Sequence, residues 1–343
     1  MVGVKQLEDD NLLAKCANAI PKQSKLPQFL EGARVPLYCF GSQCLIDHES
    51  FGEVSCISED EESILDSLLL AQWEDRAMKG IFRYDVTASE IKAIEGRKKF
   101  LAQLNEAWNM DHLPKPEGDR TFHLEDVFEF KSLKQQDELL VCVASSEKST
   151  SGLIASTAVP DEAILIFMNA SPVEYGHVLL VPYRTNSFYQ FLDASCLQMA
   201  VRVAVGINNC CFRLFYNSSP DASHLYFQAC YFSNHLAVEL MPVDAFYGNV
   251  KSGIYISAVT DYPIKTVLFE SNQKFKTMME GSENTSSLSA WECGGYFLFK
   301  SRSEFDLATE KTMLKRLSTA SIDDEGFNAV KLLCCHTARK FDF

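Results

Sequence analysis

The chain has 343 residues, of which 47% are apolar and 23% are charged, and it carries a formal net charge of −14. This composition is that of an ordinary globular protein and argues against wholesale disorder. The acidic excess, without a dominant cluster of Lys and Arg, argues against a nucleic-acid partner. A nucleotide needs only one local pocket rich in hydrogen-bond donors, so a ligand of that size stays compatible with the charge.

The sequence also carries signals of cellular location. The sequence contains no run of about 18 apolar residues, so it predicts no membrane-spanning helix. The N-terminus lacks the basic flank and apolar run of a secretory signal. The twelve cysteines are scattered, mostly inside apolar runs, as is typical of reduced thiols. No C-x-x-C pair is present, so we expect no zinc site, and neither a metal nor a cofactor. We therefore expect a protein of the cytoplasm, and also of the nucleus, with no membrane partner.

The predicted elements begin after a polar arm at residues 1–30. A helix is predicted over Ser63–Lys79, because apolar residues such as Leu65, Leu69 and Trp73 recur at helical spacing. Gly80 follows this helix as a stop signal. Residues 111–135 contain proline and charges and are predicted to be connecting loops with a short helix.

The remaining predictions, in chain order, place strands and helices as follows. Strands are predicted at 81–94, 98–108, 163–168, 177–182, 211–216, 224–232 and 296–299, and helices at 189–208 and around 311–317. A flexible loop is predicted at 281–289. A meander of strands with a helix favours an α+β fold with an antiparallel sheet. We place one domain at 31–243 and a smaller C-terminal region at 244–343.

One predicted strand, SHLYFQACYF at residues 223–232, concentrates polar side chains on one face. Side chains alternate along a strand, so His224, Tyr226 and Gln228 share a face, while Leu225 and Phe227 line the other. The residues alone leave two interpretations open. The polar face is either a solvated sheet surface or part of a binding site.

A series of distinctive sequence blocks runs from about Gly32 to about Glu310: GARVPLY (32–38), QWEDRAMKGIFRYDVTASE (72–90), FLAQLNE (100–106), NASPVEYGHVLLVP (169–182), FRLFYNS (212–218), HLYFQACY (224–231), YPIKTVLFE (262–270) and AWECGGYFLFKSRSEF (290–305). In this order the blocks resemble those of the GDP-L-galactose phosphorylases and the related GDP-D-glucose phosphorylases, and they fit the plant galactose branch better. The resemblance implies a histidine-triad fold, in which an antiparallel sheet is flanked by helices.

The resemblance also implies a reaction. These enzymes transfer GMP from GDP-L-galactose to phosphate through a guanylylated histidine, giving GDP and L-galactose 1-phosphate, a step toward ascorbate in plants. A neutral imidazole attacks the α-phosphorus and forms a labile phosphoramidate. Hydrogen-bond donors, commonly backbone N–H groups of a small-residue loop, stabilise the phosphoryl oxygens.

The nucleophile position departs from this pattern. The family motif is H-L-H-x-Q with the second histidine as nucleophile, whereas this chain has His224, Leu225, Tyr226, Phe227 and Gln228. A phenol ionises only near pH 10, and its phosphodiester is far less labile than a phosphoramidate. His224 lies roughly 7 Å farther along the same face, too far to replace a nucleophile that needs near-ångström placement.

Other departures affect the surroundings of the predicted site. Residues 218–223 (SSPDAS) contain a proline and Asp221 but no glycine, where the family has a Gly/Ala-rich phosphate loop. Phe215 stands where the family usually has glycine, and Glu129 stands where it has asparagine. Between residues 279 and 290 the family holds several dozen more residues, so we predict a truncated second half with an incomplete sheet.

Four further residues are candidates for the site. Asn169, Asn217 and Ser218 are predicted to bind ribose or phosphate, with turn or capping roles as the alternative. The resemblance implies that His177 supports the active-site strand, and a hydrogen-bonded core histidine is the alternative. The other histidines show no metal-ligand spacing: His48, His112, His123, His235 and His336.

Two functional hypotheses follow. In the first, the chain is an active GDP-hexose phosphorylase. In the second, it is a pseudoenzyme that binds a GDP-hexose or guanine nucleotide, or a partner protein, without turnover. The partner protein would be a second copy of the chain or an active paralogue. The replaced nucleophile, the altered segment 218–223 and the predicted loss of C-terminal strands favour this second hypothesis. A gene copy without a selected role stays a third alternative.

Overall fold

The computed structural model describes most of the chain. The described residues are 34–41, 63–108, 138–184 apart from 147 and 149, 187–188, 192–216, 225–271 apart from 252, 275–280 and 288–340. The arm predicted at 1–30, the loops predicted at 111–135 and most of the loop predicted at 281–289 lie outside these residues. Among the described residues, every helix is too short or too polar to cross a bilayer.

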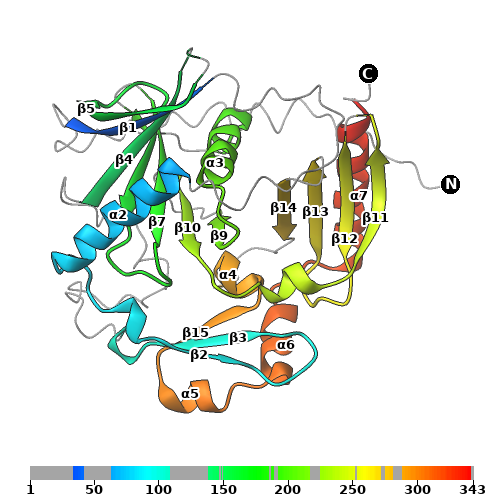
Figure 1. The fold of residues 1–343 in the computed structure, drawn as a ribbon. Helices are drawn as coiled ribbons and strands as arrows, with labels where there is room; N and C mark the ends of the chain where they lie inside the picture. The colour runs from blue at the N-terminus through cyan, green and yellow to red at the C-terminus, as the bar shows by residue number, and fades with distance from the viewer. Residues whose placement is uncertain are drawn as a thin grey trace.

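The largest layer is an eight-stranded sheet (Figure 1). Its strands are β1 (Arg34–Phe40), β4 (Leu139–Ser145), β5 (Gly152–Ala158), β6 (Ile164–Met168), β7 (Val178–Arg184), β8 (Ser187–Phe188), β9 (Phe212–Phe215) and β10 (Phe227–Tyr231). They run in the order β5-β1-β4-β6-β7-β10-β9, with β8 paired to β7. The pair β1–β4 is parallel and the other pairs are antiparallel. The predicted α+β class with an antiparallel sheet is confirmed.

Two helices, α2 (Ile64–Met78) and α3 (Ala194–Ile207), cover one face of this sheet. The buried side of α2 carries Leu65, Leu69 and Trp73, as its periodicity predicts. The predicted helix at 189–208 begins later, at Ala194, because the carboxylate of Asp193 accepts the backbone N–H of Cys196 and caps the helix there.

A second, four-stranded antiparallel sheet lies in the C-terminal part of the chain. Its strands are β11 (Val243–Asn249), β12 (Ile254–Val259), β13 (Thr266–Ser271) and β14 (Phe275–Glu280), and α7 (Asp324–Arg339) packs on it through Phe327 (Figure 1). The sequence predicted neither these strands nor this helix. The predicted truncation of the second half stays a prediction.

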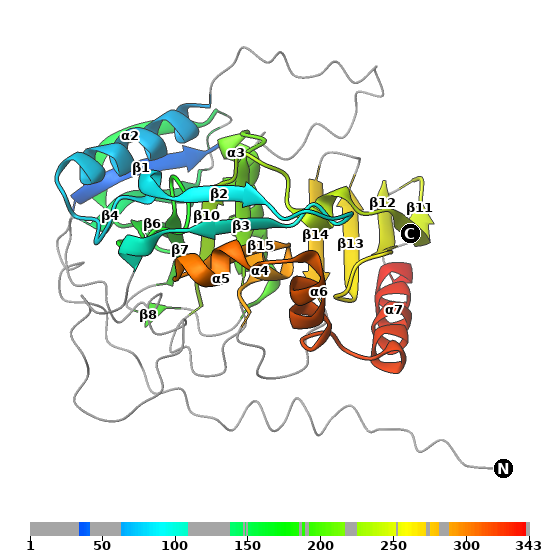
Figure 2. The same cartoon turned by 90° about the horizontal axis from the view of Figure 1, so that it is seen from below.

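A third sheet joins distant parts of the chain. It consists of β2 (Glu90–Ala93), β3 (Leu101–Leu104) and β15 (Tyr296–Phe299), the last parallel to β3 (Figure 2). The short helices around these sheets are α4 (Ala290–Cys293), α5 (Arg302–Asp306), α6 (Glu310–Ser318), η3 (Val86–Ala88), η4 (Glu106–Trp108) and η9 (Ala237–Leu240). A strand of the predicted domain at 31–243 thus pairs with one from 244–343, and the boundary between them stays a prediction.

This region also corrects two predicted strands and confirms other elements. The predictions of strands at 81–94 and 98–108 are wrong in extent, since the observed strands are shorter. In the first segment Asp85 caps the short helix η3, and in the second residues 106–108 form η4. The strand at 296–299 is confirmed as β15, and the helix around 311–317 is confirmed as α6.

The turn between β6 and β7 depends on a glycine in the left-handed region. Gly176 has φ +67°, and a Cβ atom built on it would lie 2.4 Å from the ring of Tyr231. Gly80 has nearly the same φ, +68°, but nothing lies within 4 Å of its Cβ position. Both positions therefore favour glycine because of their positive φ, but only Gly176 also lacks room for a Cβ atom.

We predict that Gly176→Ala destabilises the protein more than Gly80→Ala does. Both substitutions place alanine at positive φ, at a cost of about 1–2 kcal/mol. Gly176→Ala adds a clash with a buried ring, and overpacking of this kind costs about 1–3 kcal/mol more. Urea unfolding of the two variants measures the difference, and equal losses would contradict the role assigned to the contact with Tyr231.

Candidate functional site

The site is built on β10, whose side chains alternate between two apolar layers. Phe227 and Ala229 join the core beneath α2 and α3. Gln228 points to the other face, where Tyr226 packs against the cluster that contains Leu179. The prediction that Tyr226 and Gln228 share a face is confirmed, although the strand begins at Phe227 and not at His224.

The interpretation of this face as a solvated surface is wrong at Gln228. The side chain of Gln228 is only 4% exposed, and that of His177 is 0% exposed. Their contact is a hydrogen bond of 3.0 Å between His177 Nε2 and Gln228 Oε1. The two polar groups satisfy each other inside the protein, as buried polar groups must.

The geometry fixes the tautomer of His177. The backbone N–H of Val173 donates to His177 Nδ1 at 2.9 Å, so Nδ1 carries a lone pair. The proton of the neutral ring therefore sits on Nε2 and is donated to Gln228. Burial lowers the pKa of His177 to about 4, and the hydrogen bond with Gln228 opposes this shift. The imidazole is neutral at physiological pH.

The turn that carries His177 is held from several sides. Asn169 Oδ1 accepts the backbone N–H of Ser171 at 2.9 Å, and the backbone N–H of Asn169 donates to the carbonyl of His177 at 3.1 Å. The indole of Trp73 in α2 also donates to this carbonyl, at 3.3 Å. Asn169 thus acts as a turn residue, which is the alternative that the sequence left open, and its role toward a ligand stays a prediction.

The back of the site comes from the C-terminal part of the chain. Trp291 in α4 is fully buried, and its ring meets that of His177 edge-on at a centroid distance of 6.0 Å. The hydroxyl of Tyr296 in β15 donates to Glu174, the residue after Val173. Burial raises the pKa of Glu174, while the hydrogen bond from Tyr296 lowers it.

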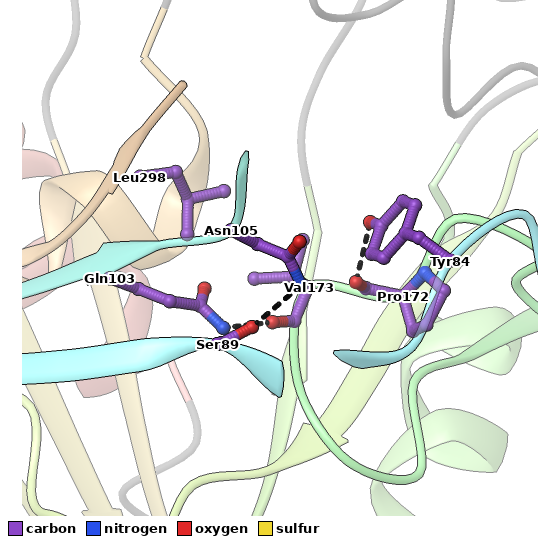
Figure 3. A pocket seen from close by; sticks show the side chains of 7 residues that line it. All are labelled: Tyr84, Ser89, Gln103, Asn105, Pro172, Val173 and Leu298. Carbon is purple, nitrogen blue, oxygen red and sulfur yellow. Dashed lines mark hydrogen bonds between the residues drawn. The ribbon is translucent and has the colours of Figure 1, made fainter. Parts of the chain in front are cut away.

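A small hollow lies beside this turn (Figure 3). It is lined by polar side chains that already have partners, since Tyr84 Oη donates to the carbonyl of Pro172 at 2.6 Å and Gln103 Nε2 donates to that of Val173 at 2.7 Å. The hollow has room for a single water-sized molecule. It supports the turn and is too small for a nucleotide.

The nearby cationic side chain on β9 is already paired. Arg213 Nε lies 2.8 Å from Glu239 Oε1, and Arg213 Nη2 lies 3.1 Å from Glu239 Oε2. A phosphate at this arginine would have to compete with a bidentate carboxylate. His235 also contacts Glu239, at 3.1 Å.

The structure brings together four of the seven predicted site residues: Asn169, His177, Tyr226 and Gln228. His224, Asn217 and Ser218 lie outside the described residues, so their roles stay predictions. Sequence reasoning missed Trp73, Glu174, Trp291 and Tyr296 as parts of the site. The available signal was that each lies inside one of the family-like blocks, QWEDR, NASPVEYGHV and AWECGGY.

Comparisons with known proteins agree with the resemblance seen in the sequence. The model described as GDPGP1-like, N-terminal domain matches residues 64–230, and the model described as GDPGP1-like, C-terminal domain matches residues 279–341. The chain is 29% identical to GDP-L-galactose phosphorylase 1 of Arabidopsis thaliana, over 89% of this chain and 80% of that protein. It is 26% identical to GDP-D-glucose phosphorylase 1 of Homo sapiens, over 61% of this chain and 52% of that protein.

Among solved structures, yeast Ap4A phosphorylase Apa2 is similar, with a TM-score of 0.46 and 13% identity, over 76% of this chain and 95% of that one.

The buried imidazole predicts a pH dependence of stability. His177 has a pKa of about 4 in the folded protein and about 6.5 when unfolded. The unfolded state thus binds a proton that the folded state excludes, so stability is fully present above about pH 6.5 and is lost as the pH falls toward 4. Between about pH 7.5 and pH 5 we expect His177 to account for a loss of about 2 kcal/mol.

The matched control is His177→Gln, which can accept from Val173 and donate to Gln228 but does not titrate. Urea unfolding of both proteins over this pH range measures the difference, because carboxylates elsewhere contribute equally to the two profiles. If the free energy of unfolding changes with pH in the same way for wild type and His177→Gln, the fold does not lower the pKa of His177, and the prediction is wrong.

Proposed function

Because this chain belongs to the GDPGP1-like family, we propose that it keeps a guanine-nucleotide site on the β7–β10–β9 face but does not turn over a GDP-hexose. The reaction proposed for an intact site is phosphorolysis of GDP-L-galactose to GDP and L-galactose 1-phosphate. That reaction needs an imidazole nitrogen with a free lone pair in line with the α-phosphorus. In this chain the corresponding position holds Tyr226.

One observation carries the proposal. His177, the imidazole beside Gln228, has Nδ1 accepting from Val173 and Nε2 donating to Gln228, and its side chain is 0% exposed. A ring with both nitrogens engaged and no access to solvent does not attack phosphorus. The phenol of Tyr226, in turn, packs against an apolar cluster, and a phenol is a poor nucleophile at neutral pH because it ionises only at about pH 10.

Electrostatics support weak binding of the nucleotide and no catalysis. Glu174 stands behind the site and Arg213 is neutralised by Glu239. A phosphate would therefore rely on amide and backbone donors, such as the side chain of Gln228. Such donors bind a phosphate, but the transition state requires additional preorganised charge.

The alternative is an active GDP-hexose phosphorylase. Membership of the GDPGP1-like family favours it. The choice between GDP-L-galactose and GDP-D-glucose belongs to the same alternative, and with GDP-L-galactose the reaction would contribute to ascorbate synthesis.

We also propose a cytoplasmic, and additionally nuclear, location. All nine cysteines among the described residues are free thiols, which fits a reducing compartment. A second copy or an active paralogue is the protein partner that we propose for a chain without turnover.

The test is a phosphorolysis assay with GDP-L-galactose or GDP-D-glucose and phosphate, comparing wild type with Tyr226→Phe. We expect both proteins to release GDP at the same background rate, because the phenol takes no part in the chemistry. Intact mass spectrometry should find no adduct of one GMP on either protein. A wild-type rate above that of Tyr226→Phe, or an acid-labile GMP adduct, would establish the active alternative.

We further predict that Tyr226→His alone does not restore phosphorolysis. A histidine at this position supplies a nucleophile, but residues 218–223 still contain a proline and Asp221 and no glycine, so donors for the phosphoryl oxygens remain few. The same assay measures the outcome. Turnover by Tyr226→His would mean that the nucleophile is the sole defect of the site.

A further inference from the structure

Phe215 of β9 lies directly across from Gln228. In the antiparallel pair β9–β10, the partner of Gln228 is Phe215, and residues directly opposite each other project to the same face. On the other side of β10, Gln228 pairs with Leu179 of β7. The amide of Gln228 is therefore flanked by two apolar side chains, with His177 and Trp291 behind.

The ring of Phe215 spans the space between this face and α4. Its centroid lies 5.9 Å from that of Trp291, with the rings at 90°, and 5.7 Å from that of Phe232, with the rings at 78°. Trp291 and Phe232 are 0% and 2% exposed. Figure 1 shows α4 close to the ends of β9 and β10. The ring thus closes the approach to Gln228 from the β9 side.

The two flanks of Gln228 differ in burial. Leu179 is 4% exposed and belongs to the apolar core of the sheet. Phe215 is only half-buried and sits on β9, the last strand of the sheet. Of the two, Phe215 is the side chain whose removal would open a path to the amide without emptying the core.

We propose that Phe215 occludes the guanine-nucleotide site and sets its affinity, by filling the volume beside Gln228 that the phosphoryl group of a bound nucleotide would occupy. This inference rests on the function proposed above, because it takes the β7–β10–β9 face as the nucleotide site. The inference attributes weak nucleotide binding to Phe215, whereas the lack of turnover is attributed to Tyr226.

The experiment measures the dissociation constant of GDP by titration calorimetry for wild type, Phe215→Ala, Phe215→Leu and Leu214→Ala. Leu214 is the matched control, because it is also half-buried on β9 but packs on the opposite face, toward α2 and α3. We expect the dissociation constant to fall roughly tenfold or more in Phe215→Ala, equivalent to about 1.4 kcal/mol. Phe215→Leu should be intermediate, and Leu214→Ala should equal wild type.

Three outcomes would overturn the proposal. If wild type binds GDP and Phe215→Ala binds it no tighter, the site exists but Phe215 does not occlude it. If Leu214→Ala gains as much as Phe215→Ala, general loosening explains the effect. If Phe215→Ala and Phe215→Leu both lack a cooperative thermal transition, Phe215 is a structural core residue. A fourth pattern, in which every folded variant fails to bind GDP, would reject the proposed nucleotide site itself.

Discussion

The arrangement of the site depends on one buried imidazole with a fixed proton. His177 accepts from Val173 and donates to Gln228, while the carbonyl of Val173 accepts from Gln103 of β3. These bonds tie β10 of the large sheet, the turn before β7 and the third sheet into one connected set. Each member is buried, so the loss of one leaves the next without its partner, at a cost of about 1–3 kcal/mol. The set therefore behaves as a unit.

The same turn joins the two parts of the chain that the family models match. Glu174 accepts from Tyr296, and the ring of His177 meets that of Trp291. A carboxyl group in this position is disfavoured as an anion, since burial raises its pKa, and the hydroxyl of Tyr296 offsets part of that effect. The C-terminal residues that complete the site thus also stabilise the polar groups of the turn.

The sequence predicted features that depend on local pattern. The helix at 63–79 follows from the spacing of Leu65, Leu69 and Trp73, and the shared face of Tyr226 and Gln228 follows from alternation along β10. It did not predict that this face is buried, because the covering residue Trp291 comes from a segment more than 60 residues later. The sequence also did not predict α7. Leu332 and Leu333 are apolar but exposed, so the apolar residues of this segment do not fall on one face of a helix.

Part of the site, then, is predictable only once the tertiary contacts are known. The tautomer of His177 is set by the backbone N–H of Val173, a group that every residue except proline possesses and that no sequence motif reveals. The pairing of Phe215 with Gln228 likewise depends on the register between β9 and β10. Neither feature can be recognised from the composition or the periodicity of the sequence.

His177 and Gln228 have a structural role, and this role provides a reason for their presence that does not involve catalysis. If His177 and Gln228 served catalysis alone, their presence beside a tyrosine at the position predicted for the nucleophile would be unexpected. Both are buried and bonded to each other, so replacing either leaves an unpaired polar group in the core. The side chain at 226 packs against the apolar cluster that contains Leu179, a contact that a phenol ring can make. The fold therefore requires His177 and Gln228 whether or not the site reacts, and their presence carries no weight as evidence for turnover.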